Sequence, residues 1–142
     1  MTTSPPLSFS RNLDPLARDA RTSSRKLTIA ITQLTRTLAR QPDEHEIASA
    51  LQLTSAEYRR TLTRIADLDT PALDLLALEE SDLNHAIAQV PAAVQNLLAL
   101  YYGEDCSAEE VGAVLGMTPA RAQELHAEAM HRLQAMIALR RH

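Results

Sequence analysis

Aromatic residues and glycines are scarce in this sequence of 142 residues. It contains one Phe, three Tyr, no Trp and three Gly, whereas Ala and Leu are abundant. Strands favour aromatic residues and tight turns favour glycine, while Ala and Leu favour helices. We therefore expect an all-α protein with little room for a sheet.

Cysteine and long apolar runs are also nearly absent. Cys106 is the only cysteine, which excludes an internal disulfide and a cysteine-based zinc site. No apolar run approaches the ~20 residues that a membrane span needs, and residues 1–12 lack the apolar core of a signal peptide. We expect a cytoplasmic protein without a membrane partner.

No pattern typical of catalysis or metal binding is present. Paired carboxylates, a nucleophile triad and a glycine-rich phosphate loop are missing, and no histidines have HExxH spacing. The sequence predicts no enzyme, no cofactor, no metal and no small-molecule substrate. We expect all five histidines at the surface: His45, His85, His126, His131 and His142.

The two halves of the chain differ in charge. Residues 1–64 hold ten Lys/Arg against six Asp/Glu, whereas residues 65–142 hold four against twelve. Nucleic-acid-binding domains usually present a basic surface, which the second half lacks. In the first half Arg18, Arg21 and Arg25 share one helix face, which is either a DNA-facing stripe or an ordinary solvated surface.

A short pattern occurs twice, 64 residues apart. Residues 46–54 (EIASALQLT) align without a gap to residues 110–118 (EVGAVLGMT). Each copy predicts a short helix, a tight turn and a Thr that caps a second helix. Ala48 and Gly112 are the small residues where the two helices must approach closely. This arrangement is typical of a helix-turn-helix, and two copies point to transcription.

Caps and breaks divide the chain into short helices. Asp14 with Pro15 starts one helix, and Ser107 with Glu110 has the sequence of a capping box. The later helices are expected at about residues 24–40, 43–51, 54–66, 81–89, 91–102, 107–116 and 118–139. In the last helix we expect one buried stripe, made by Ala122, Leu125, Ala129, Leu133 and Met136.

These elements group into two small helical domains. Residues 14–66 form the first and residues 81–139 the second, each with one helix-turn-helix. Residues 67–80 carry acidic residues but no Lys or Arg, and we expect them to be an acidic linker. Residues 1–13 are expected to be a disordered N-terminus, and residues 140–142 a tail.

The second domain resembles a known family. Its pattern consists of Val90-Pro91, Leu97 to Glu104, Glu110-Val111-Gly112, Leu115, Thr118, Arg121, Leu125, Ala129 and Leu133. This pattern resembles region 4 of sigma-70-family sigma factors, the bacterial RNA polymerase subunits that recognise promoters. Tyr101 to Glu104 and Leu125-His126 resemble the flagellar subgroup in particular.

The first domain resembles region 3 of the same subgroup. The resemblance lies in Gln41-Pro42 and Glu46-Ile47-Ala48, which precede the region 4 pattern in the family's order. It implies a helical fold, the flap of core RNA polymerase as a partner and promoter −35 DNA as a target. Region 2, which melts the −10 element in the family, has no counterpart here, so we expect a truncated regulator that cannot open a promoter alone.

The helix that reads DNA in the family is altered in this sequence. The resemblance assigns Thr118, Arg121, Gln123 and Glu124 to its DNA-binding side. Arg121 suits guanine and Gln123 suits adenine. Glu124 and Glu128, however, stand where the family has a polar and a basic residue, and carboxylates repel phosphates. We therefore expect weak DNA binding.

The apolar scaffold of region 4 is retained. In the flagellar subgroup an anti-sigma factor docks apolar residues into grooves between the sigma helices. Here the corresponding partner-binding residues are Leu97, Leu98, Val111, Leu115 and Leu125. Three possibilities stay open. The chain is a partial sigma factor, or a decoy that binds the anti-sigma factor and frees the full-length sigma factor. The third possibility is an inert relative, or a fragment whose region 2 is encoded separately.

Overall fold

The computed structural model describes residues 15–67 and 79–141, with side chains from 19 to 67 and from 79 to 140. Within these ranges the chain forms helices and loops and no strand, as the sequence predicts. The elements are α2 (Pro15–Leu38), α3 (Glu44–Ala50), α4 (Ser55–Ala66), α5 (Glu80–Gln89), α6 (Ala92–Leu98), the π-helical turn η2 (Ala99–Gly103), α7 (Ala108–Leu115) and α8 (Pro119–Arg141). The expected disordered N-terminus and most of the expected linker lie outside the described residues.

Three predicted helix boundaries differ in the structure. Helix α2 is continuous from Pro15 to Leu38, where two helices were expected. Its Ser/Thr-rich segment lowers helix propensity, but burial of Leu27 and Ile31 outweighs that effect. Helix α5 begins at Glu80 instead of Ser81, and the helix expected over residues 91–102 changes at Ala99 into η2.

Capping boxes fix the start of each short helix of the repeats. Ser107 accepts a hydrogen bond from the backbone N–H of Glu110, whose carboxylate accepts one from the N–H of Ser107. This confirms the predicted capping box. Asp43 and Glu46 form the same pair before α3. These bonds satisfy N–H groups that a helix start would otherwise leave without partners.

The two helix-turn-helix units have the same turn. The N–H of Leu53 donates to the carbonyl of Ala48 at 2.9 Å, and the N–H of Met117 donates to the carbonyl of Gly112 at 2.8 Å. One residue in each turn has a positive φ, 62° at Gln52 and 73° at the equivalent Gly116. The repeat predicted from the sequence is therefore a repeat in the structure.

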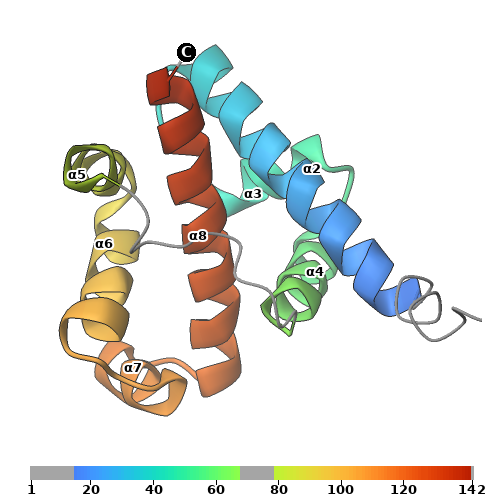
Figure 1. The fold of residues 1–142 in the computed structure, drawn as a ribbon. Helices are drawn as coiled ribbons and strands as arrows, with labels where there is room; N and C mark the ends of the chain where they lie inside the picture. The colour runs from blue at the N-terminus through green and yellow to red at the C-terminus, as the bar shows by residue number, and fades with distance from the viewer. Residues whose placement is uncertain (1–14, 68–78, 142) are drawn as a thin grey trace, which may run out of the picture.

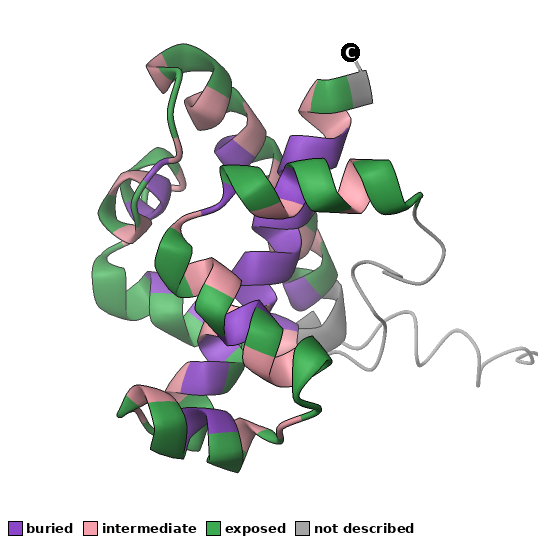
Figure 2. Cartoon of the chain, turned by 90° about the vertical axis from the view of Figure 1, so that its left-hand side faces the viewer, coloured by how far each residue is buried: buried purple, intermediate pink, exposed green. Residues whose placement is uncertain are grey.

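Helix α8 is the centre of the molecule. It lies between α2, α3 and α4 on one side and α5, α6 and α7 on the other (Figure 1). Buried residues follow one another along it (Figure 2), and they form one core with residues from both halves of the chain. The division into two domains stays a proposal, since both halves bury side chains against the same helix. No described helix has the length and apolar character that crossing a membrane requires.

Gly112 has no room for a side chain in the second helix-turn-helix unit. A Cβ placed on it would lie 2.5 Å from the carbonyl oxygen of Met117, a backbone atom that cannot move aside cheaply. We expect Gly112→Ala to lower the free energy of unfolding by about 1–3 kcal/mol. Urea unfolding measures this change. Gly103→Ala is the control, because a Cβ at that position would meet nothing within 4 Å; equal effects of the two substitutions would contradict the prediction.

Candidate nucleic-acid and partner interface

The start of α8 is the end of the helix expected to read DNA. The hydroxyl of Thr118 accepts a hydrogen bond from the N–H of Arg121 at 3.1 Å and so caps the helix. Thr118 and Gln123 are exposed, while Arg121 and Glu124 are turned toward α3 and α4. The four expected DNA-binding residues therefore divide into an exposed pair and a pair in contact with the first half of the chain.

Arg121 is held by two carboxylates. One guanidinium nitrogen lies 2.8 Å from Glu44 of α3, and another lies 3.0 Å from Glu124, one turn along α8. Glu124 also accepts hydrogen bonds from Arg59 and Thr63 of α4, both at 3.2 Å. Burial acts to raise the pKa of Glu124, but its bonds from Arg121, Arg59 and Thr63 outweigh burial and hold that pKa below its ordinary value.

A second, deeper network lies two turns further along α8. The hydroxyl of Tyr58 donates to Glu128 at 2.7 Å, and Arg132 pairs with the other oxygen of that carboxylate at 3.3 Å. Arg132 also donates to the carbonyl of Pro42 at 2.8 Å. Burial, and then the charge of Glu128, raises the pKa of Tyr58. Both side chains of the ion pair are only 4% exposed. The network therefore joins α8 to α4 and to the segment before α3 that contains Pro42.

The two glutamates therefore lie elsewhere than the sequence comparison suggested. Glu124 and Glu128 were expected on the side of α8 that faces DNA in the family. Instead they are 9% and 3% exposed, and both contact residues of α4. A single buried stripe was expected on α8, but this second face is buried as well. The regular spacing of Glu124, Glu128 and Arg132 is the signal that could have identified it.

His131 corrects the expectation that all histidines lie at the surface. It is fully buried between α8 and α2. Its Nδ1 lies 2.6 Å from the carbonyl of Ala127, which can only accept, and its Nε2 lies 2.6 Å from the hydroxyl of Ser24. We assign the proton to Nδ1 and the donor role to Ser24, which makes the ring neutral. His45 and His85 are exposed, His126 is half-buried, and His142 lies outside the described residues.

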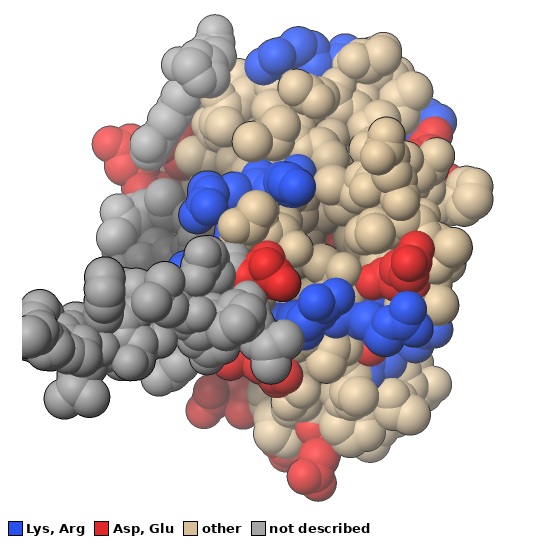
Figure 3. All heavy atoms as spheres, turned by 90° about the vertical axis from the view of Figure 1, so that its right-hand side faces the viewer, with Lys and Arg blue, Asp and Glu red and all other residues tan. Residues whose placement is uncertain are grey.

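Of the three α2 arginines expected to form a DNA-facing stripe, the structure describes the side chains of two. Arg21 and Arg25 are exposed, whereas the side chain of Arg18 is outside the described set. On α4, Arg60 and Arg64 are exposed as well. Figure 3, which views this side of the molecule, shows basic atoms interspersed with acidic ones. This face carries both signs of charge instead of a continuous basic stripe.

An apolar pocket opens on the other side of α8. Its volume is about 220 Å³, below the ~300–1,000 Å³ of typical small-molecule sites, so it suits side chains of a partner. The lining residues are Ala93, Val94, Asn96, Leu97, Leu115, Met117 and Leu125. Three of the five expected partner residues, Leu97, Leu115 and Leu125, thus line one pocket. Leu97 lines the pocket although it is a core residue, 2% exposed. Leu98 and Val111, 5% and 0% exposed, are core residues that do not line it.

Metal binding has no structural support in the described part of the chain. No three His, Cys, Asp or Glu side chains there come together in a way that could hold an ion. Cys106 is a free, half-exposed thiol. The candidate site consists of two surfaces on α8. One is the side where Arg121 is held by Glu44 and Glu124, which we call the closed side, and the other is the open apolar pocket.

The buried His131 predicts a dependence of stability on pH. Burial lowers its pKa below the ordinary value, so the unfolded chain binds more protons than the folded chain just below about pH 6.5. Stability should be fully present above that pH and fall as the pH drops toward the lowered pKa. Half-buried His126, whose pKa burial also lowers, adds to the same trend.

Urea unfolding at about pH 7 and about pH 5 measures this slope above the range where carboxylates titrate. We expect His131→Gln to reduce the slope, even though it lowers stability at both pH values. His85→Gln is the control, because His85 is exposed. A slope that is unchanged in the His131 variant would contradict the assignment of the buried neutral ring.

Sequence comparisons identify known proteins that are similar to this chain. Residues 23–83 match the family described as Sigma-70 region 3, and residues 86–135 match Sigma-70, region 4. The "RNA polymerase sigma factor FliA" of Pseudomonas aeruginosa is 28% identical over 153 residues, which cover 90% of this chain and 62% of the relative. FliA of Salmonella typhimurium is 29% identical, and the match covers 89% of this chain and 64% of that relative.

A solved structure is also similar to the chain. It is titled "Cocrystal structure of the flagellar sigma/anti-sigma complex, Sigma-28/FlgM", and the match has a TM-score of 0.46 and 22% identity. The match covers 93% of this chain and 65% of that one. The chain spans about 62–64% of the length of the two FliA relatives.

Proposed function

Because the chain belongs to the sigma-70 family, through its regions 3 and 4, we propose that it regulates bacterial transcription by protein contacts and reads promoter DNA only weakly. The observation that carries this proposal is the position of Arg121, which is held by Glu44 and Glu124 at 2.8 and 3.0 Å. The proposed place of action is the cytoplasm, where bacterial RNA polymerase works.

Weak DNA reading follows from what a promoter would have to displace. A base or phosphate that reached Arg121 would compete with two carboxylates, and both would then be left close to the DNA backbone. Each such charge repels phosphates and reduces the gain from counterion release. Of the DNA-binding residues expected on α8, Thr118 and Gln123 remain exposed, and neither carries a charge.

Protein contact is favoured by the apolar pocket. It is open although much of α8 is buried, and Leu97, Leu115 and Leu125 supply much of its lining. Apolar anchors of a helical partner dock into grooves of this kind. The first candidate partner is the flap of core RNA polymerase, which would make the chain a sigma-like regulator of the polymerase.

A second candidate function, the decoy, is favoured by the combination of both surfaces. A chain whose pocket is open while its Arg121 side is closed can hold the flagellar anti-sigma factor without occupying a promoter. It would then free the full-length sigma factor. Both functions use the same pocket, and they differ in which partner forms the tighter complex.

DNA binding tests the closed position of Arg121. We expect the protein to bind a flagellar-type −35 duplex in the non-specific range of about 10⁻⁴–10⁻⁶ M at physiological salt. Replacing Glu44→Gln together with Glu124→Gln should strengthen binding about tenfold, because Arg121 is released and two carboxylates are neutralised. Adding Arg121→Ala should remove most of that gain. Fluorescence anisotropy of a labelled duplex measures all three.

The matched control is Glu79→Gln with Glu80→Gln. These exposed residues at the start of α5 carry the same two charges but do not contact Arg121. The control should change DNA affinity by less than about threefold. Nanomolar, sequence-selective binding by the unaltered protein, or equal gains from the two double substitutions, would show that Arg121 is not restrained in solution.

Partner binding tests the pocket. Calorimetry with core RNA polymerase and with the flagellar anti-sigma factor should give a saturable 1:1 complex with at least one of them. Ala93→Arg should weaken that complex at least about tenfold, because the exposed Ala93 lines the pocket and a long side chain there blocks it. Ala92→Arg makes the same change one residue away, outside the pocket lining, and should have little effect.

The tighter partner decides between the two functions. A complex with the anti-sigma factor alone supports the decoy, and a complex with core polymerase alone supports the polymerase regulator. No complex with either protein at about 50 μM would contradict the proposal that this chain acts by protein contact.

A further inference from the structure

The segment from α5 to α7, whose helices α6 and α7 line the apolar pocket, carries charge of one sign. No Lys or Arg occurs between Arg64 and Arg121. Every Lys, Arg, Asp or Glu that the structure describes from residue 79 to the end of α7 is therefore acidic. These residues are Glu79, Glu80, Asp82, Glu104, Asp105, Glu109 and Glu110. Within the described part, Asp82 pairs with Arg140 at 2.9 Å, while Glu104, Asp105 and Glu109 form no ion pair.

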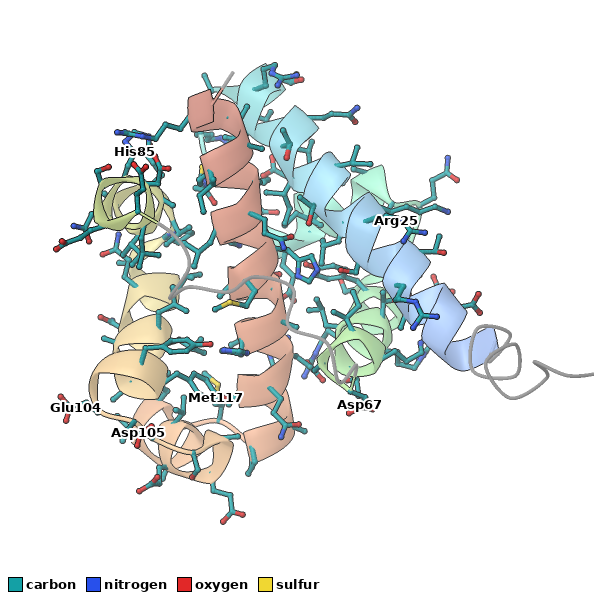
Figure 4. All side chains as sticks on the ribbon, in the orientation of Figure 1. Arg25, Asp67, His85, Glu104, Asp105 and Met117 are labelled. Atoms are coloured by element: carbon teal, nitrogen blue, oxygen red, sulfur yellow. The ribbon has the colours of Figure 1, made fainter. Side chains whose placement is uncertain are left out.

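Three of these carboxylates lie near the pocket. In Figure 4, Glu104 and Asp105 lie at the same end of the molecule as Met117, which lines the pocket. Glu109 lies on α7, six residues before the pocket residue Leu115, which is about 9 Å along the helix and about 120° around it. That separation is comparable to the ~8–10 Å over which charges interact at moderate salt.

The half-exposed thiol of Cys106 is affected by negative charges in the same segment. Burial, followed by the negative charges of Glu110, Glu104 and Asp105, raises its pKa. Each of these three carboxylates therefore acts on the Cys106 thiol. An anionic partner such as DNA is disfavoured here, because its phosphates would meet unpaired carboxylates.

Two exposed apolar residues lie on the elements that carry these carboxylates. Among the described residues, three large apolar side chains are more than half exposed: Ile29, Tyr102 and Val114. Tyr102 and Val114 belong to η2 and α7, the elements that carry Glu104 and Glu109. Apolar anchor sites beside acidic residues are complementary to a helix with an apolar face and Lys or Arg beside it.

We propose that the pocket of α6, α7 and α8, with Glu104, Asp105 and Glu109 beside it, is the docking site for a basic amphipathic helix of a partner protein. This inference rests on the proposed function and specifies the charge of the partner segment. A helix fits better than an extended peptide, because the described residues offer no strand edge for an added strand. A helix of about 18 residues is ~27 Å long and spans both the pocket and the carboxylates.

A second copy of this chain is a poorer occupant. Its basic helix α4 carries Arg59, Arg60 and Arg64, but the apolar residues of that helix, Leu62 and Ile65 among them, are already buried in its own core. Docking through α4 would require unfolding that core. The proposal therefore commits to a segment of another protein.

The test uses two synthetic peptides of about 18 residues, long enough to form a helix in water. Both have Leu at positions i, i+3, i+4 and i+7 and Ala at most of the remaining positions, and they carry about four Lys or about four Glu beside the Leu face. Fluorescence anisotropy with the full chain should show the Lys peptide binding at least about tenfold tighter than the Glu peptide. The difference should shrink as salt is raised. Ala93→Arg should weaken the Lys peptide about tenfold, and Ala92→Arg should not.

Charge reversal separates a specific acidic site from general attraction. Glu104→Lys with Glu109→Lys should weaken the Lys peptide about tenfold. Asp19→Lys with Asp67→Lys changes the net charge equally but lies on α2 and at the end of α4, so it should cost less than about twofold. Thermal unfolding confirms that each variant is folded. If Glu109→Lys unfolds α7, then Glu104→Lys with Glu109→Gln serves in its place, with a smaller expected loss.

Four results would overturn the inference: equal binding of the two peptides, equal losses from the two charge reversals, displacement of the Lys peptide by duplex DNA, or a dimer that Ala93→Arg dissociates. Its failure can be told apart from failure of the proposed function. If the two peptides bind alike while Ala93→Arg still weakens a complex with polymerase or anti-sigma factor, only the charge of the partner is wrong. If both proteins bind the Ala93 variant unchanged, the pocket itself is not the contact.

Discussion

Burial of α8 from two sides is the constraint on which the rest of the structure depends. One side packs against α5, α6 and α7, which is how a helix-turn-helix holds its second helix. The other side packs against α2 and α4, and an ion pair joins it to α3. Because both sides are occupied, Arg121 points toward Glu44 instead of solvent. The same packing leaves the pocket at Leu97, Leu115 and Leu125 as the open apolar surface described on this helix.

The ionic residues at this contact explain why it has one defined arrangement. Buried ion pairs contribute little net stability, because desolvation offsets most of their attraction, but breaking one leaves an uncompensated charge. Glu128 satisfies Tyr58 and Arg132, while Glu124 satisfies Arg121 and Arg59. A shift of α8 by one turn would separate all of these groups. The carboxylates that we propose to disfavour DNA binding are thus groups that hold α8 against α4.

Local sequence signals predicted most of the helices and the repeated unit. Caps such as Ser107 with Glu110, and the spacing of the two copies, depend only on neighbouring residues. The continuity of α2 could not be read in this way, because tertiary burial of Leu27 and Ile31 overrides the weak helix propensity of the Ser/Thr segment. The pocket was anticipated only in part: Leu97, Leu115 and Leu125 line it, but Leu98 and Val111 belong to the core.

The second buried face of α8 was missed for a physical reason. Charged residues and histidine normally lie at the surface, so Glu124, Glu128 and His131 indicated an exposed side. Each is buried with a partner from the first half of the chain: Arg59, Tyr58 and Ser24 respectively. Such pairing depends on contacts between residues 65 to 107 positions apart, which no local pattern encodes.

The central claim is that α3 and α8 meet in solution through Glu44 and Arg121. A double-mutant cycle with Glu44→Gln, Arg121→Met and the double substitution tests it directly, with urea unfolding as the measurement. The partly buried pair, 28% and 23% exposed and joined at 2.8 Å, should give a coupling energy of about 0.5–1.5 kcal/mol. Additive effects, with a coupling within about 0.3 kcal/mol of zero, would mean that the two residues do not interact and that the reading helix is open.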